Sequence, residues 1–241
     1  MLIALEGIDG AGKRTQLELL AKAIATQGLP CEMVSFPVYD SFFGRLIQSY
    51  LNGEYGALEQ VDPHFSALLF AADRQQQAAH LRELLGSGKT VLADRYVASN
   101  LAHQGARVPP AKRPEFLDWL RHLEYEIYEM PAEDLALYLR ISPEEAMHRA
   151  EERARRRDAE TGGEQTDLHE TSLEHLAGAA RVYDQLARAD NWITIDCTET
   201  ATGKRRTRDE VHSLVMAAVN VRLARFRATR ALEAAAPPST E

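Results

Sequence analysis

Gly7-Ile8-Asp9-Gly10-Ala11-Gly12-Lys13 is the stretch of this 241-residue chain that decides its fold. It fits the pattern G-x-x-x-x-G-K and stands between an apolar run at residues 2–5 and an amphipathic stretch at residues 13–27. In that context the glycines let backbone N–H groups turn toward phosphate oxygens, and Lys13 adds a positive charge. The alternative, an ordinary glycine-rich turn, is disfavoured by the register of three glycines and a lysine. The pattern predicts a nucleotide-phosphate site formed by Gly7, Ile8, Asp9, Gly10, Ala11, Gly12, Lys13, Arg14 and Thr15.

Outward from this loop, short apolar runs alternate with longer amphipathic stretches. The short runs are mostly aliphatic without polar alternation, which is typical of strands covered on both faces. Strands separated by helices favour right-handed crossovers and a parallel sheet. The predicted strands are 2–5, 32–36, 90–93, 135–141 and 192–195, and the predicted helices are 13–27, 41–51, 62–86, 111–129, 143–157, 169–190 and 209–233. We therefore expect an α/β protein with the P-loop NTPase fold, a three-layer α/β/α arrangement around a five-stranded parallel sheet. One domain should span residues 1–233, with a disordered tail at 234–241.

The composition narrows the classes of function. The chain has 28 Lys and Arg against 36 Asp and Glu, a net charge of −8, which argues against a general nucleic-acid binder. Its two cysteines, Cys31 and Cys197, are too far apart in sequence for a CxxC metal pair or a disulfide framework. No apolar run approaches the roughly 18–20 residues of a membrane span, and no signal peptide is evident. We expect a cytoplasmic protein without nucleic-acid or membrane partners.

One position departs from the phosphate-loop pattern. Arg14 stands where a Ser or Thr hydroxyl usually binds Mg²⁺, and Thr15 follows about 100° further around the helix. Because arginine cannot bind a cation, the metal would need phosphates, water and carboxylates from elsewhere. Arg14 then either supplies positive charge to the site or is a surface residue of the helix.

A second motif, Asp94-Arg95, directly follows the predicted strand at 90–93. An aspartate at the end of a strand beside a phosphate loop can orient Mg²⁺ and its waters, and the planar fork of an arginine can hold a phosphate. A structural ion pair at the strand end is the alternative.

With these motifs the sequence resembles the thymidylate kinases, and most closely their actinobacterial branch. The resemblance is collinear from residue 2 to about residue 197. The residues that carry it are Gly-Ile-Asp-Gly-Ala-Gly-Lys-Arg-Thr at 7–15, Phe-Pro-Val-Tyr at 36–39, Phe70 with Arg74, Asp-Arg-Tyr-Val-Ala-Ser-Asn at 94–100, and an Arg-rich stretch followed by Asp167-Leu-His-Glu170. The phosphate loop alone is generic, whereas the later motifs in this order are specific to the family.

The resemblance implies that the protein uses Mg·ATP to phosphorylate dTMP to dTDP. It implies that Phe70 stacks on thymine, that Arg74 and Asn100 bind the edge of the base, and that Arg95 holds the acceptor phosphate. Without the other motifs, Phe70 and Arg74 would be a core aromatic and a solvated arginine at helical spacing. The implied substrate-binding residues are Asp9, Phe36, Tyr39, Phe70, Arg74, Arg95, Ser99, Asn100, Asp167 and Glu170, and the implied metal ligands are Asp9, Asp94 and Glu170. The family also implies a homodimer packed through helices.

Five arginines lie within residues 149–157. Arg149 and Arg153 share a helical face, and in the family this segment, here about 148–168, is a lid that closes over ATP. Interspersed glutamates leave open a solvated helix with local ion pairs. His169 stands where the family often has tyrosine, so a ring contact is not assigned to it.

We expect in-line transfer without a strong general base, because the acceptor is already an anion. We expect the catalytic residues to position the two substrates and, with Mg²⁺, to neutralise charge in the transition state. These residues are Lys13, Arg14, Asp94, Arg95, Arg149 and Arg153. Two alternatives remain: another deoxynucleotide or deoxynucleoside kinase, or a nucleotide-binding regulator that does not turn over.

Overall fold

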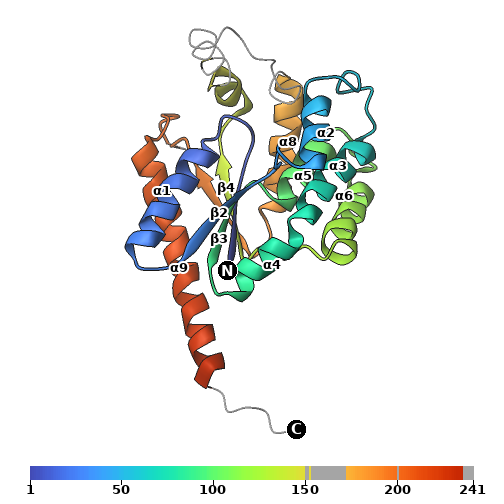
Figure 1. The fold of residues 1–241 in the computed structure, drawn as a ribbon. Coiled ribbons are helices and arrows are strands. Elements are labelled where there is room, and N and C mark those ends of the chain that lie inside the picture. The colour runs from blue at the N-terminus through green and yellow to red at the C-terminus, as the bar shows by residue number, and fades with distance from the viewer. Residues whose placement is uncertain (150–151, 153–171, 200, 236–241) are drawn as a thin grey trace.

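A five-stranded parallel sheet forms the centre of the computed structural model, which describes residues 1–149, 152, 172–199 and 201–235 (Figure 1). The strand order is β2-β3-β1-β4-β5. The bounds are Leu2–Glu6 for β1, Cys31–Ser35 for β2, Thr90–Asp94 for β3, Leu135–Arg140 for β4 and Trp192–Asp196 for β5. All five predicted strands are confirmed, each within one residue at either end. Among the described residues, no helix is long and apolar enough to cross a bilayer.

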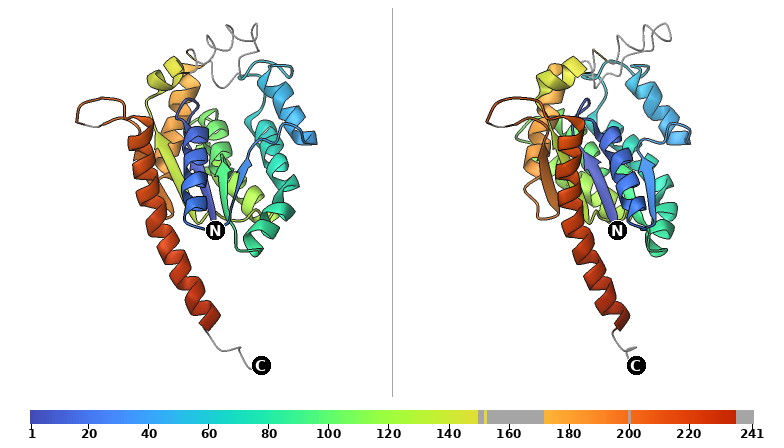
Figure 2. Two further views of the ribbon diagram at one scale, coloured as in Figure 1. Left: turned by 60° about the vertical axis from the view of Figure 1, so that its left-hand side comes forward. Right: turned by 90° about the vertical axis from the view of Figure 1, so that its left-hand side faces the viewer.

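Helices cover both faces of the sheet, which confirms the three-layer α/β/α fold (Figure 2). One layer consists of α1 (Lys13–Thr26) and α9 (Arg208–Ala235), which pack on each other. The other layer is built around α5 (Val97–Ala106), which packs on α8, α3 and α6. The remaining bounds are Phe42–Leu51 for α2, Pro63–Gln76 for α3, Ala78–Gly86 for α4, Arg113–Arg121 for α6 and Leu173–Leu186 for α8. The far end of α9 projects beyond the amino ends of the strands (Figure 1).

Helix α5 was missed by the sequence analysis, and its burial explains why. Every residue from Val97 to Gly105 is buried, because three helices pack on α5 and Ser99 contacts Glu6 of β1. A helix without a solvent face has no polar stripe and therefore no amphipathic period. Its polar residues, Ser99 and Asn100 among them, face the interior of the molecule and not water.

Two predicted helices are divided in the structure. The stretch 62–86 becomes α3 and α4, separated at Gln77, whose N–H bonds back to the Arg74 carbonyl. The stretch 111–129 becomes α6 followed by a π-helical segment, η1 (His122–Ile127). Such wider turns are rare in helices and are often found at functional sites. No glycine or proline marks either division, so the helical period alone could not reveal it.

The lid and tail predictions fall largely on residues outside the described set. Residues 143–149 are helical, as expected, but most of the predicted lid at 148–168 is not described. Helix α8 begins at Leu173, where Ser172 caps it, and residues 169–171 of the predicted helix lie outside the described residues. Helix α9 continues through Ala235, two residues beyond the predicted end at 233. Residues 236–241 lie outside the described residues.

Candidate active site

The phosphate loop follows β1 and leads into α1, at the carboxyl edge of the sheet. All three of its glycines have positive φ, 141° at Gly7, 86° at Gly10 and 90° at Gly12. The Cα atoms of Gly7 and Gly10 also lie close to neighbouring backbone. A Cβ at Gly7 would stand 2.6 Å from the Leu139 carbonyl oxygen, and one at Gly10 would stand 2.8 Å from that of Ala146. Both the backbone conformation and the space therefore require glycine at these two positions.

Lys13 lies under the loop with its side chain almost wholly buried. Its Nζ donates to the carbonyl oxygens of Gly7 at 2.9 Å and Ile8 at 3.1 Å, and lies 3.9 Å from Asp9 Oδ1. Burial, together with the positive charge of Arg95, lowers the pKa of Lys13 to about 8, although Asp9 opposes the shift. The loop therefore holds the ammonium in place, and its buried environment makes the ammonium more acidic than that of an exposed lysine.

Two cavities adjoin the loop. The larger, about 570 Å³, is called here the loop cavity, and the smaller, about 140 Å³, the aromatic cavity. The loop cavity is lined by Asp9, Gly10, Gly12, Lys13, Arg14, Thr15, Asp94, Arg95, Arg149, Glu152 and Arg205. The aromatic cavity is lined by Asp9, Phe36, Pro37, Tyr39, Leu51, Phe70, Arg74, Arg95, Ser99, Asn100, His103 and Gln104. Asp9 and Arg95 line both, so they form the boundary between the two spaces.

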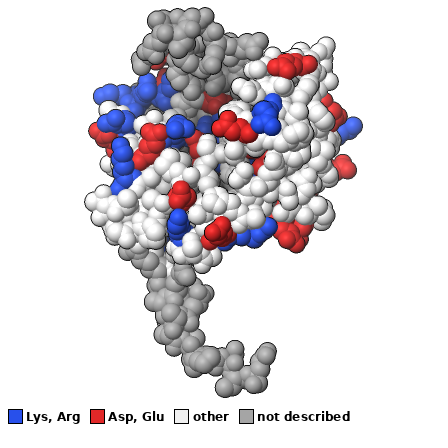
Figure 3. Space-filling model, viewed as in Figure 1, with Lys and Arg blue, Asp and Glu red and all other residues white. Residues whose placement is uncertain are grey.

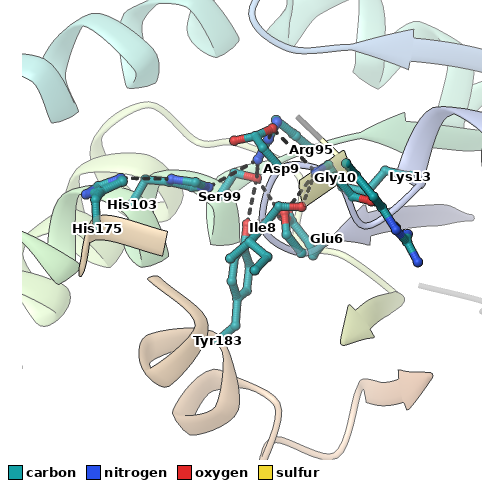
Figure 4. A network of polar contacts seen from close by, with 12 residues as sticks. Glu6, Ile8, Asp9, Gly10, Lys13, Arg95, Ser99, His103, His175 and Tyr183 are labelled. Carbon is teal, nitrogen blue, oxygen red and sulfur yellow. Dashed lines mark hydrogen bonds and ion pairs between the residues drawn. The ribbon is translucent and has the colours of Figure 1, made fainter. Parts of the chain in front are cut away.

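Arg95 reaches this boundary because the backbone turns sharply after β3. Its φ of 65° is in the left-handed region, which is unusual for a residue other than glycine. The guanidinium forms an ion pair with Asp9 through Nη2, and its Nη1 donates to Ser99 Oγ at 3.2 Å (Figure 4). Burial would lower the pKa of Arg95, but the Asp9 carboxylate and other acidic groups raise it above the ordinary value. The side chain is therefore permanently charged and fixed toward Asp9, not toward the adjacent Asp94.

A buried polar network supports Arg95 from below (Figure 4). Glu6 accepts hydrogen bonds from the Tyr96 N–H at 2.8 Å, Ser99 Oγ at 2.6 Å and the Tyr183 hydroxyl at 3.0 Å. Ser99 therefore connects Glu6 to Arg95. From the sequence, Ser99 is predicted to bind substrate, whereas Glu6 carries no signal. In the structure Ser99 lines the aromatic cavity and also holds the arginine.

Two imidazoles extend the network toward α8. His103 Nε2 lies 3.3 Å from Arg95 Nη1, and His103 Nδ1 lies 3.2 Å from His175 Nε2. Burial lowers the pKa of His103 well below its ordinary value and that of His175 to about 4, and the charges of Arg95 and Arg107, respectively, lower them further. Both rings are therefore neutral at pH 7.

Arg74 and Asn100, which both line the aromatic cavity, bind the same buried carboxylate. Arg74 is 2% exposed and forms a two-pronged ion pair with Glu124, whose Oε2 accepts from Nε at 3.0 Å. Asn100 Nδ2 donates to the Ala67 carbonyl oxygen and to Glu124 Oε1, both at 3.0 Å. Arg74 is therefore not a solvated helix residue. Phe70, one turn before it on α3, is half-buried and also lines the cavity.

The segment after β2 forms the opposite wall. Phe36 is buried against Tyr96, with ring centroids 5.8 Å apart, and precedes a cis peptide bond to Pro37. Asp73, on α3, holds the segment by accepting hydrogen bonds from the Val38 N–H at 3.0 Å and from Ser41 Oγ at 2.9 Å. Tyr39, between these two anchored residues, lines the cavity while half of its surface faces solvent.

Basic side chains surround the mouth of the loop cavity, and Figure 3 shows them gathered near the starts of α1 and α9. Arg149 donates from Nη1 to the Gly10 carbonyl oxygen at 2.8 Å and from Nε to Glu145 at 2.7 Å. Arg205 contacts the same Glu145 oxygen at 3.5 Å. Arg14 lies at the rim with 74% of its side chain exposed and pairs with Glu18. The predicted site residues Arg153, Asp167 and Glu170 lie outside the described residues.

The donor set at the loop cavity suits Mg²⁺ held jointly with phosphates. Asp9 and Asp94 both line the cavity, and the Thr15 hydroxyl is nearby. Within the described part of the chain, no group of three acidic, histidine or cysteine side chains could hold a metal ion alone. Mg²⁺ commonly binds one or two carboxylates and completes its shell with phosphate and water oxygens. Two carboxylates beside a phosphate loop fit that mode of coordination.

The residues of the two cavities and their support that were not identified from the sequence include Glu6, Asp73, His103, Glu124 and Arg205. Asp73 precedes Arg74 directly, so the motif around Arg74 could have suggested it. The other four carry no local signal, because each becomes significant only through neighbours distant in sequence.

Comparison with known proteins identifies the family. A family model described as thymidylate kinase matches residues 5–206. A thymidylate kinase of Mycobacterium tuberculosis is 34% identical over 193 residues, which cover 80% of this chain and 87% of that protein. Human thymidylate kinase is 35% identical over 148 residues, 61% of this chain and 64% of the human protein. A solved structure of thymidylate kinase from Candida albicans shares the fold, with a TM-score of 0.67, 21% identity and coverage of 91% of each chain. The chain therefore belongs to the thymidylate kinase family and is an enzyme that phosphorylates dTMP.

Proposed function

We propose that the aromatic cavity holds dTMP, that the loop cavity holds Mg·ATP, and that the γ-phosphoryl group passes between them at Asp9 and Arg95. The observation that carries this proposal is that these two side chains line both cavities. In-line transfer needs the two nucleotides end to end, with their phosphates meeting at one point. Asp9 and Arg95 mark that point.

The base of dTMP would lie between Phe70 and the wall formed by the segment after β2. An aromatic ring stacked on a base contributes about 1–3 kcal/mol in nucleic-acid complexes. Arg74 and Asn100 would bind the edge of the base, since both line the cavity and both are held by Glu124. Tyr39, with Asp9, would lie on the sugar side.

The transfer step would depend on positive charge. The dTMP phosphate is already an anion, so no strong base has to remove a proton from it. Arg95 would bind that phosphate through its planar fork, while Lys13 and Arg149 would lie against the donor phosphates. Asp9 keeps Arg95 oriented through their ion pair. Arg14 would add charge at the rim, and Arg153 would add charge from the lid.

Mg²⁺ would be held by Asp9 and Asp94 together with phosphate oxygens, with Glu170 as a further ligand. When bound, the ion would neutralise charge on the oxygens of the transferring group. The role of the chain is to present two carboxylates that leave most of the coordination shell to substrate and water.

We further propose a cytoplasmic homodimer. Phe65 and Leu68 lie one turn apart on α3 and are 48% and 39% exposed, so they offer an apolar strip for packing against a second copy. Sedimentation would test this, and a Phe65→Glu variant that remains the same size as wild type would contradict it.

An acceptor-specificity assay tests the reaction. ADP release would be measured with Mg²⁺ and ATP against dTMP, dUMP, dCMP, AMP and thymidine. We expect turnover of dTMP above all others. Turnover of thymidine without dTMP would instead identify a nucleoside kinase. Binding of both nucleotides without a single turnover would identify a regulator.

A further inference from the structure

Glu124 is a fully buried carboxylate that contacts both side chains assigned to the edge of the base. It is 0% exposed and lies on η1, the π-helical segment that follows α6. Its two oxygens accept from Nε and Nη2 of Arg74, and Oε1 also accepts from Asn100 Nδ2. These contacts occupy defined atoms of both partners, so they determine which atoms remain for a ligand.

The amide of Asn100 is oriented by two acceptors. The Glu124 carboxylate and the Ala67 carbonyl oxygen both lie 3.0 Å from the same end of the amide, which must therefore be the NH₂ group. Asn100 Oδ1 is left without a hydrogen-bond partner among the described residues, although the side chain lines the aromatic cavity. A buried acceptor without a partner is costly unless a ligand supplies a donor.

Arg74 is oriented in the same way. With Nε and Nη2 each directing one N–H to Glu124, Nη1 keeps two N–H donors that bond to no other described residue, in a side chain that lines the cavity. Two residues that line the cavity thus keep an acceptor, at Asn100, and a donor, at Arg74, that Glu124 does not use. Thymine and uracil carry the matching pattern, a hydrogen on N3 and a carbonyl at C4. Cytosine carries the opposite pattern, so it would set acceptor against acceptor and donor against donor.

We propose that Glu124 makes the enzyme selective for pyrimidines with a hydrogen on N3 and a carbonyl at C4, by fixing the orientation of Asn100 and Arg74. This rests on the proposed placement of the dTMP base in the aromatic cavity. Glu124 does not touch the base and is a positioning residue. We expect its effect at the N3 and C4 edge, because it holds Arg74 and Asn100, the two side chains assigned to that edge.

Glu124→Gln tests the proposal. Glutamine offers one acceptor and one donor, so it no longer forces the Asn100 amide into one orientation or accepts both prongs of Arg74. The Ala67 carbonyl still favours the original orientation, so we expect a partial loss. The ratio of kcat/KM for dTMP to that for dCMP should fall at least tenfold. The ratio for dTMP to dUMP should stay within twofold, because both bases share the edge that Glu124 controls.

Both ratios are measured with competing acceptors in one sample, so they do not depend on the fraction of folded enzyme. Glu124→Asp is the second variant, since it keeps the charge but is too short to reach both partners, and the same change in ratios is expected. Glu133→Gln is the matched control. This carboxylate accepts from the Tyr125 hydroxyl of the same η1 segment at 2.7 Å and touches neither Arg74 nor Asn100, so its removal should leave both ratios unchanged.

The possible results distinguish the role of Glu124 from the proposed placement of the base. A wild-type enzyme that does not prefer dTMP over dCMP would overturn the proposed placement of the base. A wild type with that preference, and Glu124 variants that retain it, would overturn only the role of Glu124. Variants that lose dTMP/dCMP and dTMP/dUMP discrimination together would show a merely structural role and would also overturn it.

Discussion

The two cavities that meet at Asp9 and Arg95 are built in different ways. The aromatic cavity is walled by side chains that hold one another: Glu124 fixes Arg74 and Asn100, and Asp73 fixes the segment after β2. The loop cavity is walled by backbone and by arginines at its mouth, several of them exposed. The aromatic cavity therefore has side chains in fixed orientations, which suits a small planar ligand. The loop cavity instead concentrates positive charge.

This difference follows from what each cavity would bind. A base is recognised by a pattern of donors and acceptors, which requires fixed orientations and therefore supporting contacts. Phosphates are recognised by charge and by backbone N–H groups, which tolerate more variation in side-chain position. It also explains how a chain with a net charge of −8 can bind anions, because five basic side chains line the loop cavity: Lys13, Arg14, Arg95, Arg149 and Arg205.

The largest expected loss of activity follows from replacing Lys13, which lines the loop cavity. Lys13→Met removes the one buried ammonium that the loop holds, and we expect kcat to fall about 10²- to 10³-fold, the usual loss for a charge that stabilises a transition state. The KM for dTMP should change by less than about threefold, because Lys13 does not line the aromatic cavity. Lys22→Met, on the exposed side of α1, is the control. An equal loss of dTMP affinity would mean that the two cavities are not separate in function.

The pH profile should reveal the same side chain. With its pKa at about 8, Lys13 in the free enzyme is charged below pH 8 and loses its proton above it. Because the charged form is needed, kcat/KM for ATP should fall about tenfold per pH unit above pH 8. In Lys13→Arg, whose side chain keeps its charge, the decline should disappear even if the activity is lower. A decline that persists in this variant would assign the titration to another group.

A smaller effect is expected from the support of the aromatic cavity. Asp73→Asn replaces one of the two acceptors that hold Val38 and Ser41, at a net cost of about 0.5–1.5 kcal/mol. The KM for dTMP should therefore rise about three- to tenfold, and the KM for ATP should not change. Asp62→Asn is the control, since Asp62 caps the same helix without touching the cavity. A rise in both KM values would show a general loss of structure.

The smallest effect is expected at the mouth of the loop cavity. Arg205 is exposed, so solvent screens its charge, and Arg205→Ala should raise the KM for ATP only about two- to fivefold. Arg208→Ala, an exposed arginine that does not line the cavity, should have no effect. Initial rates at varied ATP would measure both. A loss of a hundredfold or more at Arg205 would contradict the view that charge at this mouth is distributed over several side chains.

The same contrast separates what could and could not be predicted from the sequence. The loop cavity is encoded locally: a glycine pattern after a strand, and an Asp94-Arg95 pair after another, place their residues at one edge of a parallel sheet. The five strands were predicted for a related reason, since a buried parallel strand is a continuous apolar run.

The aromatic cavity is encoded through distant contacts. Phe70, Arg74 and Asn100 were assigned only through the resemblance, and nothing in the sequence around Glu124 distinguishes it from the other acids of its segment. Its significance depends on η1, whose wider turn no pattern predicted, and on α5, which lacks an amphipathic period because it is buried on all sides. Pairing across fifty residues, as between Arg74 and Glu124, leaves no mark in either local sequence.

The left-handed backbone at Arg95 has an evolutionary meaning. A side chain in that conformation costs roughly 1–2 kcal/mol compared with glycine, which adopts it freely. Natural selection for folding alone would therefore favour glycine at this position. Arg95 lies where the two substrates would meet, so selection for the proposed transfer would retain an arginine there in spite of that cost.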